Sequence, residues 1–183
     1  MNDGVNEGFG NGVHRTPIVV RFGELDPYNH VNHAVYVAWC EAGRAQALAD
    51  AGVALHDMAA MGLQIVVTDL NVRFRKPAVA GDRVTVETWI SELGGARSVW
   101  KQRVLRPTDD PDHPEVLVEL EVRAGSTGTN GRPIRLPANV REALVTHMVN
   151  DRPVEGSTAT HDASTATHDA STATHDGSTA THD

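Results

Sequence analysis

The sequence predicts an α+β fold in which one long central helix packs against a five-stranded antiparallel sheet, with a short helix near the C-terminus. Two observations lead to this prediction. The stretch from Val35 to Ala49 repeats its apolar residues at three- and four-residue spacing, which is typical of a helix. Three of four later stretches alternate apolar with polar residues, which is typical of strands with one buried face.

The first strand is expected over residues 16–22, a β-branched run with a proline near its start. Turn-forming residues fill positions 23–30. Asn32 then stands where an N-cap is expected, and Gly52 stands where the helix should end. A helix of about 18 residues must bury its apolar stripe, so the sheet is expected to wrap around it.

The remaining strands are expected over residues 66–75, 84–90, 97–105 and 115–124, and the short helix over residues 138–149. In the first of these strands, alternation predicts a buried face and a solvent face. The buried face would hold Val66, Thr68, Leu70, Val72 and Phe74, and the solvent face Asp69, Asn71, Arg73 and Arg75. The connections contain hairpin-type residues, which predicts that the four strands form a meander.

The 183 residues end in four copies of a seven-residue unit, (Gly/Ala)-Ser-Thr-Ala-Thr-His-Asp, over positions 156–183. These units contain too little apolar surface to offset the entropy of ordering. Residues 151–183 are therefore expected to be a disordered tail and residues 1–15 a flexible leader. Residues 16–150 remain for one folded domain.

The formal charge is −8, and the repeats contribute four aspartates without a basic residue, which leaves 16 basic against 20 acidic residues, or −4, in the rest. A mildly acidic domain argues against nucleic-acid binding. No apolar stretch approaches the ~20 residues that span a bilayer, so no membrane association is expected. The leader has no apolar core of a targeting signal, and the single cysteine, Cys40, can form no internal disulfide. These features predict a cytoplasmic protein.

Chemistry is expected where the turn at 23–30 meets the helix, because Glu24, Asp26, His30, Asn32 and His33 gather there. The start of a helix presents unpaired backbone N–H groups and a partial positive charge, so it can hold a carbonyl oxygen that is becoming an oxyanion. A carboxylate just upstream can attack that carbonyl or activate a water molecule.

The segment Asp26-Pro-Tyr-Asn-His-Val-Asn-His-Ala-Val-Tyr36 resembles the signature of hotdog-fold acyl-CoA thioesterases of the 4-hydroxybenzoyl-CoA thioesterase type. The resemblance continues through residues 69–82 and 131–137, and it covers the chain from about residue 17 to 144. It implies a hotdog fold and hydrolysis of an acyl-CoA to the free acid and CoA, with no metal and no cofactor.

The resemblance also implies roles for the catalytic residues. Asp26 matches the family's general base or nucleophile, and the backbone N–H of His33 matches the oxyanion donor. His30 matches a histidine with a catalytic part in related plant acyl-carrier-protein thioesterases. Many relatives have glycine where this chain has Asn29, and asparagine tolerates the left-handed backbone that such a turn needs.

Substrate contacts and assembly follow from the same resemblance. Tyr28, Asn32, Val35 and Tyr36 are expected at the acyl pocket. The CoA nucleotide is expected to meet basic residues on the strands, for which Arg73, Arg75, Lys76, Arg97, Lys101 and Arg103 are candidates. Relatives bind the acyl pantetheine between two subunits, which implies a homodimer, or a dimer of dimers (a homotetramer), with a place in lipid metabolism.

Other interpretations of these residues compete with the catalytic ones. Asp26 before proline is also a common turn signal, and Glu24 is expected to be solvated. Glu41 and Arg44 are expected to form a pair on the helix surface, and Cys40 to behave as a small hydrophobe. An acyl-carrier-protein thioesterase and a non-catalytic acyl-thioester binder are the alternative functions. A hydratase of the same fold is disfavoured, because its Asp and His stand five residues apart rather than four.

Overall fold

The computed structural model describes residues 8–149, and the predicted tail with its four repeats lies outside the described residues. The helices are α1 (His33–Asp50), α2 (Leu55–Ala60) and α3 (Ala138–Val145), and a 3-10 turn, η1, spans Phe22–Glu24. The strands are β1 (Gly8–Gly10), β2 (Val13–Val19), β3 (Leu63–Phe74), β4 (Arg83–Leu93), β5 (Arg97–Arg106) and β6 (Glu115–Gly128). No helix in this part of the chain is long and apolar enough to span a membrane.

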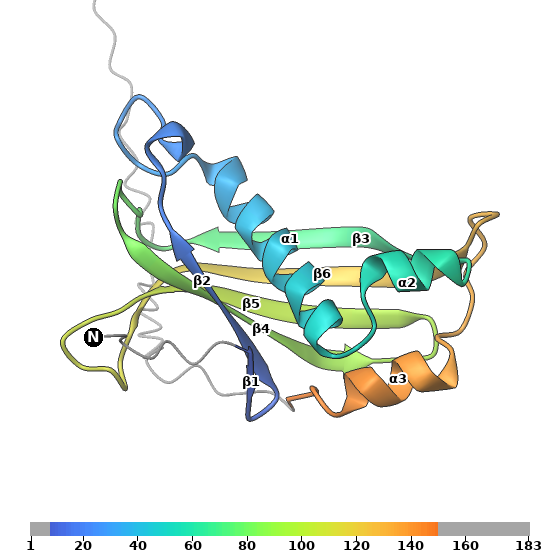
Figure 1. Cartoon of the computed structure of the whole chain (residues 1–183). Helices are drawn as coiled ribbons and strands as arrows, with labels where there is room; N and C mark the ends of the chain where they lie inside the picture. Colours follow the sequence, from blue (N-terminus) through green and yellow to red (C-terminus); the bar gives the residue numbers. More distant parts are fainter. Residues whose placement is uncertain (1–7, 150–183) are drawn as a thin grey trace, which may run out of the picture. The chain divides into compact units, whose positions relative to one another are not determined.

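The strands form one antiparallel sheet in the order β1-β2-β4-β5-β6-β3, and α1 lies across one face of it (Figure 1). The five long strands and the central helix confirm the predicted α+β hotdog fold. The expected caps are also present, since Asn32 Oδ1 accepts the N–H of Ala34 at 3.0 Å and Gly52 has a φ of 76°. The sheet buries one face of α1, which consists of Tyr36, Trp39, Cys40, Gly43, Ala47 and Leu48. The apolar stripe that the spacing predicts is therefore only partly right, because Ala38, Ala42 and Ala49 are exposed.

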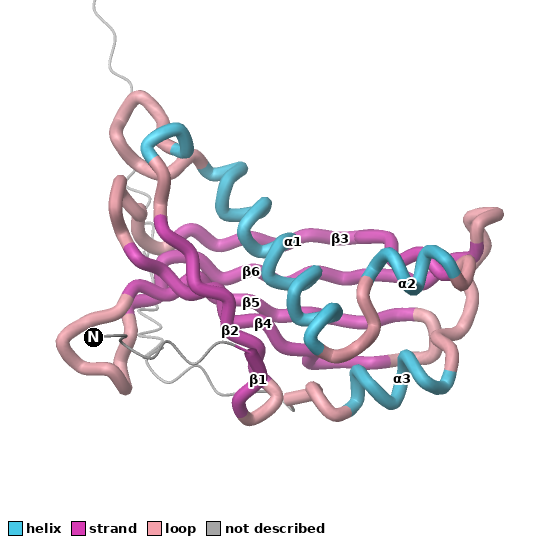
Figure 2. Tube along the Cα trace, in the orientation of Figure 1, coloured by secondary structure: helices cyan, strands magenta, loops and turns pink. Residues whose placement is uncertain are grey.

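The prediction that the last four strands form a meander is wrong for the first of them. β3 pairs with β6 at one edge of the sheet, whereas β4 pairs with β2 and β5. Residues 75–82 are therefore a crossover and not a hairpin. Hairpin loops and crossover loops have the same turn-forming composition, so composition does not reveal which strands pair. The pairing partners are set by the sheet as a whole. This crossover brings residues 75–82 to the same end of the sheet as the Asp26 turn (Figure 2).

Residues 8–15 also differ from the expected flexible leader, because they contain β1 and the start of β2. Asn11 and Gly12 have φ values of 53° and 78°, the left-handed conformation that a tight two-residue hairpin requires. The hairpin lets Val13 and His14 become buried. The first long strand therefore starts earlier than predicted and ends at Val19, before η1.

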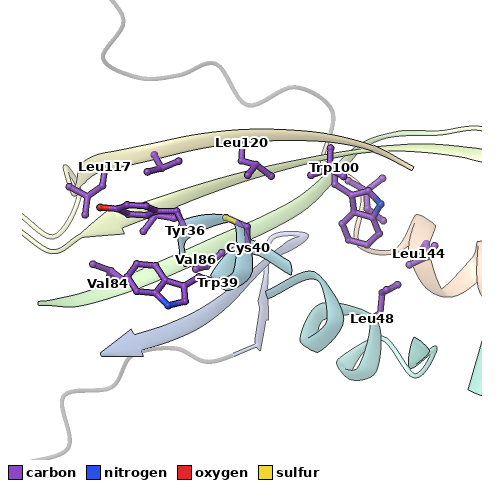
Figure 3. Packing of buried hydrophobic residues seen from close by; sticks show 14 of the residues in the cluster. Tyr36, Trp39, Cys40, Leu48, Val84, Val86, Trp100, Leu117, Leu120 and Leu144 are labelled. Atoms are coloured by element: carbon purple, nitrogen blue, oxygen red, sulfur yellow. The ribbon is translucent and has the colours of Figure 1, made fainter. Parts of the chain in front are cut away.

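The core lies between α1 and the sheet and consists largely of valine, leucine and tryptophan side chains. Figure 3 shows Tyr36, Trp39 and Cys40 of α1 together with Val84 and Val86 of β4. Burial raises the pKa of the Cys40 thiol to about 12, and the side chain is fully enclosed. Cys40 is thus a packing residue, as predicted, and not a nucleophile.

A buried amide, Gln102 of β5, joins the middle of α1 to the sheet. Its Nε2 donates to the carbonyl of Cys40 at 2.7 Å and to Thr88 Oγ1 at 2.8 Å, and its Oε1 accepts from Arg44 Nη1 at 2.6 Å. Arg44 therefore hydrogen-bonds to a buried residue of the sheet. Its predicted surface pair with Glu41 does not form among the described residues. Gly43 permits the close approach, since a Cβ there would lie 3.1 Å from Val86 Cγ1 and 3.2 Å from Thr88 Oγ1.

Replacing Gly43 by alanine is expected to destabilise the fold, although alanine is the better helix former. Overpacking typically costs about 1–3 kcal/mol, which exceeds the gain of about 1 kcal/mol in helix propensity. The neighbours are buried, and Thr88 is held by Gln102, so they have little room to move. Urea unfolding of Gly43→Ala should give a lower free energy of unfolding than wild type. The control is Ala42→Gly on the exposed face of α1, which measures the contribution of helix propensity alone. A Gly43→Ala variant that is more stable than wild type would contradict the close contact.

The end of α1 is tied to β2 by His14, whose Nε2 lies 2.8 Å from Asp50 Oδ2. Gln46 Nε2 donates to the other oxygen of the same carboxylate at 2.8 Å. The hydrogen bond with His14, and then that with Gln46, lowers the pKa of Asp50 below its ordinary value. A lowered folded-state pKa means that the Asp50 contribution to stability is present above the unfolded pKa and is lost as the pH falls through the folded one.

The Asp50→Asn variant should therefore unfold more easily than wild type at neutral pH, and this difference should shrink on acidification below the ordinary carboxyl pKa. Since the carboxylate is 38% exposed, solvent screening limits the effect to less than about 1 kcal/mol. Urea titrations at neutral and strongly acidic pH measure it. Asp109→Asn in the exposed β5–β6 loop is the control. If the difference in free energy of unfolding between Asp50→Asn and wild type is the same at both pH values, the ionised Asp50 does not stabilise the fold.

The predicted buried face of β3 is partly wrong, because a bulge between Val67 and Asp69 shifts the register. Only Leu63, Ile65 and Val72 of this strand pack on the core. Val66, Val67, Leu70 and Phe74 remain 43%, 50%, 40% and 51% exposed. No strand among residues 8–149 covers the outer edge of β3, so this edge combines free backbone groups with exposed apolar side chains.

Candidate active site

Asp26 lies in a closed turn directly before α1. The turn is bounded by an antiparallel bridge between Leu25 and Val31, and the Asp26 N–H donates to the carbonyl of His30 at 2.7 Å. Asp26 Oδ1 accepts the N–H of Tyr28 at 2.8 Å and that of His30 at 3.1 Å. Oδ2 accepts no hydrogen bond from any described residue. One carboxylate oxygen thus fixes the turn and the other is available for chemistry.

Asn29 supplies the left-handed position of this turn with a φ of 60°. The prediction that asparagine can replace glycine at this point is therefore confirmed. Tyr28 at the tip of the turn is 79% exposed, and the His30 side chain is exposed as well. The apolar ring of Tyr28 is left uncovered by the described part of this chain.

The first turn of α1 leaves one backbone donor unused. The Asn32 side chain accepts the N–H of Ala34, and the Asn32 carbonyl accepts that of Val35 at 2.9 Å. The Asn32 N–H itself donates to the carbonyl of Glu24 at 2.9 Å. His33 is the first helical residue, and its N–H has no acceptor among residues 8–149. An unpaired N–H at a helix N-terminus is suited to bind a negatively charged oxygen.

Glu24 is not solvated as predicted but helps to build the site. Its Oε1 accepts the indole N–H of Trp39 at 3.2 Å, and its Oε2 accepts the N–H of Arg21 at 2.8 Å. The residue sits in η1, which points the carboxylate back toward α1. Glu24 therefore joins the start of the turn to the second turn of the helix.

Aromatic side chains line the helix beside the turn. The ring of Phe74 meets the rings of His33 and Tyr36 edge-on, with centroids 6.5 and 5.9 Å apart. Tyr36 is itself buried, and its hydroxyl accepts the N–H of Ala78 at 2.7 Å. The Ala78 carbonyl in turn accepts the N–H of Val31 at 2.9 Å. Phe74 and Ala78 were not predicted as site residues, because the strand crossover that brings them here has no local sequence signal.

The basic residues predicted for nucleotide binding differ in their surroundings. Arg75 forms an ion pair with Glu119 at 2.7 Å, Lys76 pairs with Glu115, and Arg103 pairs with Glu87 at 2.7 Å. Arg73 is exposed and has no ion-pair partner within residues 8–149. An unpaired, exposed guanidinium is the more available partner for a phosphate group.

Comparison with known proteins shows the family of this fold. The sequence profile of the thioesterase superfamily matches residues 28–111. The solved structure of a probable thioesterase from Bartonella henselae is 30% identical, covers 68% of this chain and 99% of its own, and superimposes with a TM-score of 0.62. The chain belongs to the thioesterase superfamily. The predicted family resemblance and the predicted enzyme class, a thioester hydrolase, are thereby confirmed.

Two curated relatives of this thioesterase differ in the carrier that their names give. YneP of Bacillus subtilis, provisionally named an acyl-CoA thioesterase, is 33% identical over 54% of this chain and 71% of its own length. The acyl-acyl carrier protein thioesterase ATL3 of Arabidopsis thaliana is 28% identical over 75% of this chain and 70% of its own length.

Proposed function

We propose that this thioesterase hydrolyses an acyl-CoA to the free acid and CoA, with Asp26 as general base or nucleophile and the His33 N–H as oxyanion donor. The observation that carries the proposal is the combination of a carboxylate oxygen and a helix N-terminal N–H that have no partner among residues 8–149. They are joined by a short turn whose backbone N–H groups all have acceptors. The thioester carbonyl would lie between them.

In this mechanism the carbonyl oxygen accepts the His33 N–H, which polarises the carbon and stabilises the oxyanion that forms. Asp26 Oδ2 either removes a proton from the attacking water or attacks the carbon to give an anhydride, which water then hydrolyses. In both routes the C–S bond breaks and the CoA thiolate leaves. His30 lies in the same turn as Asp26, and its exposed imidazole would contact the substrate at the mouth of the site.

The acyl group needs apolar walls, which the exposed ring of Tyr28 and the partly buried Val35 begin to supply. Asn32 holds the turn by its cap, so its contribution to substrate binding is through the backbone it orients. Of the predicted nucleotide-binding residues, Arg73 fits best, because Arg75 and Lys76 already have carboxylate partners.

A homodimer belongs to this proposal, because apolar surface around the site is uncovered in one chain. Tyr28 and Phe74 are exposed beside the reactive groups, and the open edge of β3 leads to Phe74. Pairing β3 with β3 of a second copy would extend the sheet and satisfy the free backbone groups of both edges. Such a dimer would place apolar side chains of one copy against the site of the other, and two dimers can assemble further.

An acyl carrier protein is the second candidate carrier, favoured by the similarity to ATL3 over most of the chain. The CoA assignment is preferred because YneP has the higher sequence identity of the two relatives and because Arg73 has no ion-pair partner among residues 8–149. With either carrier the chemistry at Asp26 is the same. An acyl-CoA substrate would place the enzyme in the cytoplasm and in lipid metabolism.

The proposal is tested by measuring free-thiol release from aliphatic acyl-CoAs, aromatic acyl-CoAs and acyl carrier protein thioesters at equal enzyme concentration. Hydrolysis of at least one acyl-CoA with a higher kcat/KM than the matching carrier-protein thioester is expected. Preference for the carrier-protein substrate would replace CoA by the second candidate. If no thioester in the panel is hydrolysed, the chain is a non-catalytic binder and the proposed function is wrong.

A further inference from the structure

A single loop residue, Ala78, bonds to both halves of the proposed site. Its carbonyl accepts the N–H of Val31, the residue that closes the Asp26 turn, at 2.9 Å. Its N–H donates to the hydroxyl of Tyr36 at 2.7 Å, and Tyr36 lies about one helical turn after His33. Ala78 is fully buried, so water cannot replace either partner without a local rearrangement.

The Tyr36 side chain is itself firmly held. Its ring is enclosed by the core and meets the ring of Trp39 edge-on, with centroids 5.2 Å apart. Burial raises the pKa of the hydroxyl, so Tyr36 stays uncharged at neutral pH. Since the ring is enclosed and the hydroxyl is uncharged at neutral pH, the Tyr36 oxygen is a fixed acceptor for the loop.

Arg106, at the end of β5, holds the same loop through residues that flank Ala78. Its Nη1 donates to Asp82 Oδ2 at 2.9 Å and to the carbonyl of Pro77 at 3.4 Å, while its Nε donates to Glu115 Oε2 at 3.0 Å. Asp82 Oδ2 also accepts the N–H of Val79 at 3.1 Å. The residues on both sides of Ala78 are therefore braced, and Ala78 presents its two backbone groups at fixed positions.

We propose that Tyr36 is a positioning residue for thioester hydrolysis: its hydroxyl fixes Ala78, and Ala78 sets the Asp26 turn relative to the first turn of α1, with Arg106 bracing the loop. The inference rests on the proposed function, because the groups it positions are Asp26 and the His33 N–H. It gives Tyr36 a role different from the substrate contact expected from the sequence. Catalysis depends steeply on such spacing, and a misplacement of about 1 Å can lower a rate about 10²-fold.

The test is Tyr36→Phe, which keeps the ring and removes only the acceptor. We expect kcat to fall about 10- to 100-fold while KM changes less than about twofold, since the geometry of the reacting groups is lost but the binding surface stays. The amides of Val31 and Ala78 should exchange hydrogen faster in the variant. Arg106→Gln should shift kcat and these amides in the same direction, and Arg106→Lys should restore part of the loss.

Ser98→Ala is the matched control. It removes the acceptor of another enclosed N–H, that of Trp100 Nε1 at 3.0 Å, at the opposite end of β5 from Arg106. This variant should lower Tm and leave kcat unchanged. A Tyr36→Phe enzyme that loses stability but keeps the wild-type kcat overturns the positioning role, and so does a raised KM with an unchanged kcat, which would indicate a substrate contact. A wild type that hydrolyses no thioester refutes the proposed function itself and the positioning role with it.

Discussion

Replacing Asp26 by asparagine is expected to lower kcat/KM for acyl-CoA hydrolysis about 10³-fold, within the range that removal of a general base typically produces. The asparagine side-chain oxygen can still accept the N–H groups of Tyr28 and His30 that Asp26 Oδ1 accepts now. The turn should therefore persist. What is lost is the negative charge and the basicity of the free oxygen, which is the part that the mechanism needs.

The Asp26→Asn variant separates a loss of catalysis from a loss of folding. Thermal unfolding of Asp26→Asn should match wild type closely, and its circular dichroism should be unchanged. Asp109→Asn, which alters an exposed carboxylate in the β5–β6 loop, should keep the wild-type rate. A full rate in Asp26→Asn would show that another group activates the water or attacks the carbonyl, even though the thioesterase assignment would stand.

Replacing Leu70 by lysine is expected to separate the proposed dimer and to abolish most of its activity. Leu70 lies on the open edge strand and is 40% exposed in the single chain. Burying an unpaired ammonium in an apolar contact commonly costs about 2 kcal/mol or more, and twofold symmetry applies this cost to both copies. The dissociation constant should then rise about 10³-fold. Activity should fall with it, because the uncovered apolar surface at Tyr28 and Phe74 would lose its partner.

Sedimentation velocity and thiol release, measured at the same protein concentrations, test this expectation. Val145→Lys is the matched control, because Val145 is 47% exposed but lies on α3, away from the β3 edge. It should leave both the sedimentation coefficient and the rate unchanged. A Leu70→Lys enzyme that remains dimeric would place the interface elsewhere, and an active monomer would show that one chain forms the whole site.

Local features of this protein were predictable from the sequence because each depends on neighbouring residues. The Asn32 cap, the left-handed Asn29 and the helix stop at Gly52 all follow from the conformational preferences of single side chains. The turn that holds Asp26 belongs to the same group, since its hydrogen bonds link residues at most four positions apart.

Features that depend on strand order were not predictable in this way. The 75–82 loop was expected to be a hairpin, yet it crosses to the site because β3 pairs with β6. The roles of Ala78, Phe74 and Arg106 follow from that crossover, and so do the ion pairs that occupy Arg75 and Lys76. The bulge between Val67 and Asp69 likewise breaks the expected alternation of β3, since one added residue changes a two-residue period. Ile65 before the bulge and Val72 after it therefore both pack on the core.

The most direct test of the central claim is a crystal structure of the Asp26→Asn enzyme with an intact acyl-CoA bound. The thioester oxygen is expected within hydrogen-bond distance of the His33 N–H, about 2.7–3.1 Å, with the carbonyl carbon facing the side chain at position 26. A thioester bound away from the start of α1, or one whose oxygen is held by other donors, would contradict the proposed site.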